Sequence, residues 1–306
     1  MDKTKRFCCF IFLFWLFIST SFAQQHQLSQ VFYLYTMIGE NTPLIELKEA
    51  KALTVDLSGS IYIADTGNHR IIKLNSDGDV IKIIGGLGWE KEQFYSPSDI
   101  NASYALDIYV ADYYNHRIQR FDKYLNYIAS LYSNENWEPM LQFGYPKSIT
   151  ISIHGDLFII DGENNRIVKF NTLSAPEISF GDYGEGKGRL LQPIQAMITP
   201  DDIIYVSDSQ GNKIIVYDYF GNYLTEIGSN YLKEPKGIFY SPLNLLFVAD
   251  QGNKRIAVFK SNGDLLFSWS KISDKIGSFK NPADVVNFKN KVYVLDNDQI
   301  FVFELK

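Results

Sequence analysis

Four polar residues, spread over a long stretch of the chain, could together form one cation site. They are Asp99, Asn101, Gln195 and Asp284, and each follows a proline by two or four residues. Carboxylate and amide oxygens are the ligands that hard cations such as calcium prefer. These residues are therefore candidate calcium ligands, provided that the fold brings their segments to a common centre. The alternative is that they line a water-filled channel.

Histidine, cysteine and serine motifs give little support to other site chemistry. A zinc site needs three or four converging ligands, whereas His26, His69, His116 and His154 are widely spread. His69 and His116 occupy the same place in two similar segments, so we expect them to be polar turn residues. The chain has no HExxH, no serine nucleophile elbow and no dinucleotide fingerprint. We expect a binding role rather than catalysis, with no cofactor unless calcium is bound.

The segments that must position these residues repeat along the chain. Six apolar runs end in aspartate, and successive aspartates are 42 to 49 residues apart. The runs are IYIAD, IYVAD, LFIID, IYVSD, LFVAD and VYVLD. They are apolar at nearly every position, as expected for a strand that is buried on both faces. A period of about 40–50 residues built from strands is typical of a β-propeller.

A basic residue follows the aspartate by five positions in five of the six repeats. The repeated residues are Asp65 and Arg70, Asp112 and Arg117, Asp161 and Arg166, Asp208 and Lys213, Asp250 and Arg255, and Asp296 without a basic partner. Aspartate suits a turn because its carboxylate accepts backbone N–H groups. The basic residue could pair with the aspartate or lie along a neighbouring blade.

A second set of regularly spaced residues supports the division into six repeats. A proline precedes the aspartate by 14 or 15 residues in repeats two to six, and a large apolar residue stands three positions before each proline. The apolar residues are Phe94, Phe143, Leu190, Leu232 and Phe279. Proline suits the first residue of a strand, where no ladder hydrogen bond is lost. We expect the apolar residue to plug the loop that crosses between blades.

Together these features resemble the NHL repeat, in which an apolar strand is followed by aspartate, asparagine and then Arg-Ile. The resemblance covers residues 31–306 in six units. It implies an all-β fold, a six-bladed β-propeller of four-stranded antiparallel blades. The sixth unit ends after its third strand, while residues 31–38 have strand composition. We predict that this N-terminal strand completes blade six and closes the ring.

The first 23 residues have the build of a signal peptide. Lys3, Lys5 and Arg6 precede an apolar run of 12 residues, and small residues flank Phe22 up to Ala23. We expect cleavage near Ala23, a tail over residues 24–30 and a secreted or periplasmic protein. The alternative is an uncleaved N-terminal membrane anchor. Both cysteines lie in this leader, so the propeller must be held by its core without disulfides.

Composition restricts the partners. The net charge is −6 and the pI about 5.3. Binding to nucleic acid requires a concentrated basic face, so we expect no nucleic acid partner. We also expect no membrane insertion of the mature domain, which should act as a monomer.

Aromatic residues in the loops define the expected ligand-binding face. They are Trp89, Tyr95, Tyr113, Tyr114, Trp137, Tyr145, Tyr183 and Tyr231. Exposed aromatics beside polar residues mark interaction surfaces. The expected function is that of a scaffold that binds a protein, peptide or glycan ligand. Two alternatives remain open: some of these aromatics could fill the spaces between blades, and the chain could be a cation-dependent hydrolase or lyase with a site in the central channel.

Overall fold

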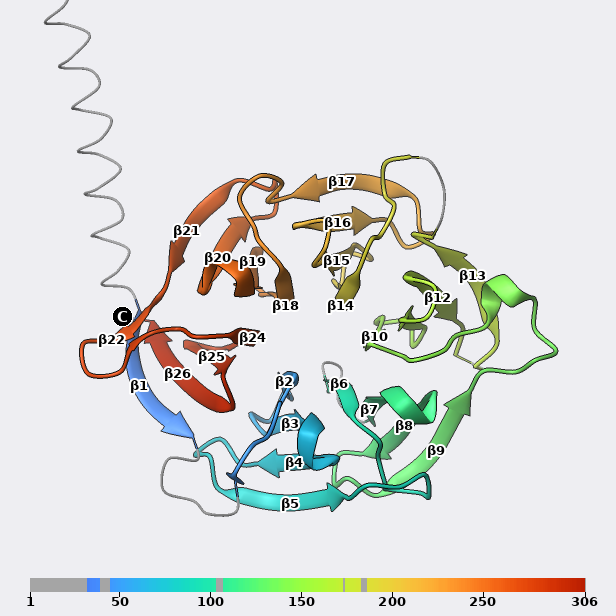
Figure 1. The fold of residues 1–306 in the computed structure, drawn as a ribbon, viewed down its shortest axis with the longest axis horizontal. Coiled ribbons are helices and arrows are strands. Elements are labelled where there is room, and N and C mark those ends of the chain that lie inside the picture. The colour runs from blue at the N-terminus through green and yellow to red at the C-terminus, as the bar shows by residue number, and fades with distance from the viewer. Residues whose placement is uncertain (1–31, 39–44, 103–106, 173, 183–185, 306) are drawn as a thin grey trace, which may run out of the picture.

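The chain folds as a six-bladed β-propeller (Figure 1). The structure, a computed structural model, describes residues 32–38, 45–102, 107–172, 174–182 and 186–305. The expected signal peptide, the tail over residues 24–30 and Tyr183 lie outside these ranges. The described residues form six four-stranded antiparallel sheets, which confirms the all-β propeller expected from the repeats.

Each of the first five blades is a meander of four consecutive strands. Blade one contains β2 (Ala52–Val55), β3 (Ile61–Asp65), β4 (Arg70–Leu74) and β5 (Val80–Gly85). Blade two contains β6 (Pro97–Asn101), β7 (Asp107–Asp112), β8 (Arg117–Asp122) and β9 (Tyr127–Tyr132). Blade three contains β10 (Ser148–Ile151), β11 (Leu157–Asp161), β12 (Arg166–Phe170) and β13 (Pro176–Phe180). Blade four contains β14 (Pro193–Ile198), β15 (Ile204–Asp208), β16 (Lys213–Tyr217) and β17 (Tyr223–Ile227). Blade five contains β18 (Pro235–Tyr240), β19 (Leu245–Asp250), β20 (Arg255–Lys260) and β21 (Leu265–Trp269).

Blade six is built from both ends of the described chain. It contains β24 (Pro282–Phe288), β25 (Lys291–Asp296), β26 (Gln299–Leu305) and β1 (Phe32–Ile38), in the sheet order β1-β26-β25-β24. The pairing of β1 with β26 is antiparallel and runs from Phe32 opposite Leu305 to Ile38 opposite Ile300. That this strand locks the ring remains a prediction, which a truncation tests below.

Short elements lie in the turns and loops. The 3-10 turns η2 (Thr66–Asn68), η3 (Tyr113–Asn115) and η5 (Gln251–Asn253) directly follow the aspartates of blades one, two and five. The 3-10 turn η4 (Pro139–Leu141) lies in the loop between blades two and three. A two-stranded sheet, β22 (Lys271–Ser273) with β23 (Gly277–Ser278), lies between blades five and six. The first strands β2, β6, β10, β14, β18 and β24 surround the centre of the ring (Figure 1).

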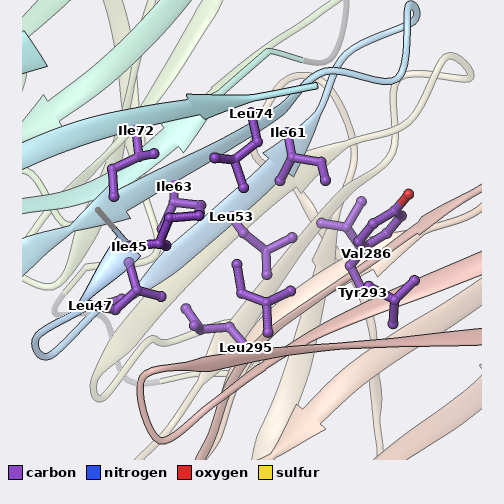
Figure 2. Packing of buried hydrophobic residues seen from close by; sticks show 13 residues of the cluster. Ile45, Leu47, Leu53, Ile61, Ile63, Ile72, Leu74, Val286, Tyr293 and Leu295 are labelled. Atoms are coloured by element: carbon purple, nitrogen blue, oxygen red, sulfur yellow. The ribbon is translucent and has the colours of Figure 1, made fainter. Parts of the chain in front are cut away.

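Apolar contacts between neighbouring blades form the core. Figure 2 shows one such cluster, in which Leu53, Ile61 and Ile63 of blade one face Tyr293 and Leu295 of blade six. Each such side chain contributes about 1.5–3 kcal/mol when it is fully buried. The five apolar residues that stand three positions before the strand-opening prolines are buried as well, as expected for residues that pack beneath the crossing loops.

Candidate functional site

The aspartate that ends each second strand anchors the loop that enters the same blade. In all six blades the aspartate Oδ1 accepts a backbone N–H from this loop at 2.6–3.0 Å. The donors are the N–H groups of Lys48, Tyr95, Gly144, Gln192, Lys233 and Asn281. Because these loops lead directly into the innermost strands, the aspartates fix the residues at one mouth of the central channel.

Four arginines complete these anchors. Arg70, Arg117, Arg166 and Arg255 pair through Nε with Oδ2 of their aspartates at 2.6–3.0 Å. Their Nη groups also donate to loop carbonyls, as from Arg117 to the carbonyl of Gln93. Of the two expected roles of the arginine, the structure shows the pairing with aspartate. The repeat varies in blade four, where Lys213 pairs with Glu226 instead of Asp208.

Polar side chains link the innermost strands around the channel. Asp99 Oδ2 accepts the N–H of Ile149 in the next blade at 3.0 Å, and Asp284 Oδ2 accepts the N–H of Leu53 at 2.9 Å. The equivalent residues of blades three and four act in the same way: Ser148 Oγ accepts the N–H of Ala196, and Gln195 Oε1 accepts the N–H of Ile238. These residues therefore satisfy backbone groups that would otherwise be buried without a partner.

Asp99 and Asp284 each belong to a blade that follows a blade without a side-chain acceptor at the equivalent position. Blades one and five have Ala52 and Gly237 at the equivalent position. The aspartate of the following blade compensates with its second oxygen, since Asp99 Oδ1 and Asp284 Oδ1 accept the N–H of the residue after them, at 2.9 and 2.8 Å. Gly237 is required here because a Cβ at this position would lie 2.0 Å from Asp284 Oδ1.

Three of the four candidate calcium ligands converge. Gln195 Nε2 lies 3.5 Å from both Asp99 Oδ1 and Asp284 Oδ2. Burial raises the pKa of Asp99, and burial together with the charge of Asp99 raises the pKa of Asp284 well above its ordinary value. Asn101 lies two residues further along β6, opposite Tyr109. The carboxylates already accept backbone N–H groups, and the described residues contain no group of three His, Cys, Asp or Glu side chains that could hold a metal.

A cavity of about 560 Å³ lies on the axis above these carboxyl groups. Three lysines line it: Lys51, Lys147 and Lys236. They come from blades one, three and five, and each lies three residues after the N–H that an aspartate anchors. The corresponding residues of the other blades are Ser98, Ile194 and Ala283, so the charge occurs in every second blade.

Burial lowers the pKa of all three lysines. The positive charges of Lys236 and Lys51 lower the pKa of Lys147 further, and Lys51 also lowers that of Lys236. Lys147 Nζ donates to Asn165 Oδ1 at 3.3 Å and Lys236 Nζ to Ser209 Oγ at 3.1 Å, both neutral oxygens. The effect of Lys51 on the pKa of both other lysines indicates that the three ammonium groups lie within electrostatic reach of one another.

Next to the cavity, four of the predicted face residues form one aromatic group. We call Tyr95, Tyr113, Tyr114 and Tyr145 the tyrosine patch. Ring centroids are 4.7 Å apart for Tyr95 and Tyr114, and 5.3 Å apart for Tyr113 and Tyr145. Tyr114 is 48% exposed, and Tyr113 also lines the cavity. The patch therefore spans blades two and three and reaches the channel mouth.

The histidines beside the patch have backbone contacts, as expected for turn residues. His69 Nδ1 accepts the N–H of Ser96, and His116 Nδ1 accepts the N–H of Tyr145. Both histidines have a left-handed backbone at the end of a 3-10 turn. They hold the loops that carry the tyrosines.

The other three predicted face residues that the structure describes differ in exposure. Trp89 is 73% exposed on its loop. Trp137 packs instead against Phe170, and Tyr231 against Phe259 and Arg255, so these two fill spaces between strands. For this pair the structure agrees with the alternative that the sequence had left open. The cavity lysines were not among the sequence candidates, although each directly follows the strand-opening residue of its repeat.

Within the described ranges, no helix has the length and apolar character needed to cross a membrane.

The chain is similar in sequence and in fold to several known proteins. Residues 94–121 match the family model of the NHL repeat. The chain is 26% identical over 127 residues to the protein brain tumor of Drosophila melanogaster, a match that covers 41% of this chain and 12% of that protein. It is 28% identical to a probable peptidyl-alpha-hydroxyglycine alpha-amidating lyase of Caenorhabditis elegans, over 39% of this chain and 36% of that protein. The matches thus span about a third or less of these relatives. A virginiamycin B lyase from Staphylococcus aureus has a similar fold, with a TM-score of 0.60 at 18% identity, over 87% of this chain and 83% of that chain.

Proposed function

We propose that this chain, which folds as a six-bladed β-propeller and matches the NHL repeat over residues 94–121, is an exported binding module. Its ligand would lie on the face that bears the tyrosine patch. The observation that carries the proposal is the contact of four tyrosine rings on loops that buried aspartates anchor. Rigid scaffolds with functional loops are a common arrangement, and tyrosine is enriched among residues that dominate binding.

The ligand class is a protein, a peptide or a glycan, bound by a monomeric propeller. Tyrosine offers an apolar ring and a hydroxyl, so the patch could pack against apolar groups or sugar rings while it donates hydrogen bonds. Export is supported by the charge and the apolar run of residues 1–23. Determination of the N-terminal sequence of the mature protein tests it: cleavage after Ala23 is expected, and an intact N-terminus would favour the membrane anchor.

The binding face is tested with a matched pair of tyrosine variants. Tyr114→Ala removes the most exposed ring of the patch, whereas Tyr124→Ala removes a 62% exposed ring in the turn between β8 and β9, at the other end of the blade. Wild type and both variants are compared on glycan arrays and peptide libraries. We expect Tyr114→Ala to lose about tenfold or more in affinity and Tyr124→Ala to retain it. Equal affinities, or no binding by the wild type, would contradict the proposal.

A channel-site hydrolase or lyase is the second candidate. The observation in its favour is the pair Asp99 and Asp284, two buried carboxyl groups with a raised pKa below an axial cavity. The contacts of these carboxylates argue against a bound cation, so we expect the melting temperature to be the same with a chelator and with calcium. A fall with chelator that calcium reverses would favour the enzyme, as would hydrolase or lyase activity that Asp99→Asn abolishes.

A further inference from the structure

We propose that the axial cavity binds a small organic anion that carries two or more carboxylate or phosphate groups, held by Lys51, Lys147 and Lys236. This site adjoins the surface that the tyrosine patch offers to a larger partner and shares Tyr113 with it, but the lysines that would hold the anion are not part of the patch. It would bind its ligand whether or not the patch has one.

The first argument concerns the pairing of the three ammonium groups. Among the described residues no ion pair includes any of these lysines, whereas four of the arginines on the same face pair with aspartate within 3.0 Å. Lys147 and Lys236 donate to an amide and a hydroxyl oxygen. The Lys51 ammonium lies 6.0 Å from the centre of the Tyr113 ring. Three like charges around one cavity repel one another, so their convergence is unfavourable until an anion is present.

The second argument is that the fold fixes the backbone next to each of the three lysines. Each lysine follows a loop that an aspartate anchors three residues earlier, through the N–H groups of Lys48, Gly144 and Lys233. The lysines are contributed by every second blade, so they approach the axis from different sides. Ammonium groups that converge on one cavity with walls of low dielectric attract an anion more strongly than the same groups would in water. Each ammonium can donate up to three hydrogen bonds to oxyanion groups.

The size and the wall chemistry narrow the ligand class. A cavity of about 560 Å³ is within the range of about 300–1,000 Å³ usual for small-molecule sites. Gln251 and Asn297 also line it and offer amide donors, and Tyr113 forms part of the wall. Three acidic residues also line it: Glu49, Asp99 and Asp298. Asp298 Oδ1 accepts the N–H of Ala50, and burial raises the pKa of Asp99, which favours its neutral form. A ligand with several oxyanion groups matches the three cations better than a neutral one.

The protonation of the three lysines gives a second way to detect anion binding. Burial lowers the pKa of the lysines, and this shift is opposed by Glu49 near Lys51 and Glu234 near Lys236. Asp161 and Asp208 oppose it near Lys147. Because only the ammonium form attracts an anion, affinity should fall as the pH rises through these lowered pKa values. Binding of an anion should raise them again, so the complex should take up protons.

The test is calorimetry with the full-length protein and three probes: citrate, inorganic phosphate and glucose. Citrate and phosphate distinguish a carboxylate ligand from a phosphate ligand, and glucose is the neutral control. The variants are Lys51→Met, Lys147→Met and Lys236→Met, singly and together. The charge-matched control changes Lys123, Lys260 and Lys289 to methionine, three exposed lysines whose side chains lie outside the cavity. Tyr114→Ala is the control for the tyrosine patch.

We expect the wild type to bind citrate or phosphate but not glucose, with proton uptake. Each single substitution should weaken binding about tenfold, and the triple variant should abolish it. The control triple variant and Tyr114→Ala should bind like the wild type. The single variants decide the question if the triple variant does not fold. Absence of binding by the wild type to either anion would overturn the proposal, and so would equal losses in the cavity and control variants.

Discussion

Two sets of charged residues meet at the loops that enter the blades, and they differ in how their charges are paired. Each cavity lysine precedes the aspartate of its repeat by 14 residues, and that aspartate anchors the loop that carries the lysine. The pairs of aspartate and arginine recur in four blades, with the carboxylates fully buried and the charges paired at 2.6–3.0 Å. The cavity lysines recur only in every second blade and belong to none of the ion pairs of the described residues. The charges repeated in four blades are thus paired within the fold, whereas the cavity lysines, which occur in every second blade, are not.

Deletion of residues 24–40 should have the largest effect, and it separates ring closure from the local anchors. The deletion removes β1, the outer strand of blade six, and leaves every pair of aspartate and arginine in place. The exposed edge of β26 should then pair with other chains and cause aggregation. Size-exclusion chromatography and thermal melting measure this. A soluble truncated protein with an unchanged melting temperature would show that the anchors hold the ring without β1.

Among single substitutions, Asp112→Asn should destabilise the protein most. It removes the partner of Arg117, whose side chain is only 2% exposed, and an uncompensated buried charge costs about 3–5 kcal/mol. Asp107→Asn is the matched control, since it breaks the exposed pair with Arg120 in the same blade, which contributes about 1 kcal/mol or less. Unfolding in urea measures both. Similar losses of stability in the two variants would contradict the structural role of the repeated pairs.

The cavity lysines should respond in the opposite direction. Without an anion, Lys147→Met removes a cation from a group of like charges, so the melting temperature should rise by about 2–4 °C, which corresponds to about 1 kcal/mol for a protein of this size. Lys260→Met, an exposed substitution at the end of β20, should leave it unchanged within about 1 °C. A clear fall in the melting temperature of Lys147→Met would mean that this lysine helps to hold the fold, and the comparison would fail.

The last prediction concerns the pH dependence contributed by Asp284, one of the two carboxyl groups beside the cavity. The pKa of Asp284 is raised in the folded protein, so between the ordinary carboxyl pKa of about 4 and this raised value the folded state binds more protons than the unfolded chain. Stability contributed by this group therefore falls as the pH rises through that window. The free energy of unfolding of the wild type, relative to Asp284→Asn, should decrease from about pH 4 upward. A difference that does not vary with pH would contradict the shift.

Much of the fold could be predicted because it depends on local patterns that recur. Apolar runs such as IYIAD can satisfy both faces only between other strands, and the prolines and the plug residues such as Phe94 mark where each blade begins. The tyrosine patch could be predicted in part, since Tyr113 and Tyr114 belong to the repeated turn. Trp137 and Tyr231 lie on equally aromatic loops, but only packing against Phe170 and Phe259 decides that they point inward.

The candidate cation site shows the limit of such patterns. The spacing correctly brought Asp99, Gln195 and Asp284 toward one centre, because equivalent strand positions face the channel. Their role depends on residues of other blades: Ala52 and Gly237 provide no acceptor, so each aspartate must satisfy two backbone N–H groups. A sequence pattern within one blade cannot reveal a hydrogen bond that is completed across two blades.

The sequence by itself determined the architecture: six blades, their strands, the anchoring aspartates and the face that bears the loops. These follow from short-range rules of burial and turn geometry that act within each repeat. Only the tertiary structure decided that Lys51, Lys147 and Lys236 share one cavity, because they are about 90 residues or more apart and meet through closure of the ring. Electrostatic repulsion and the loss of hydration depend on distance and burial in space, and neither quantity can be read from the order of residues along the chain.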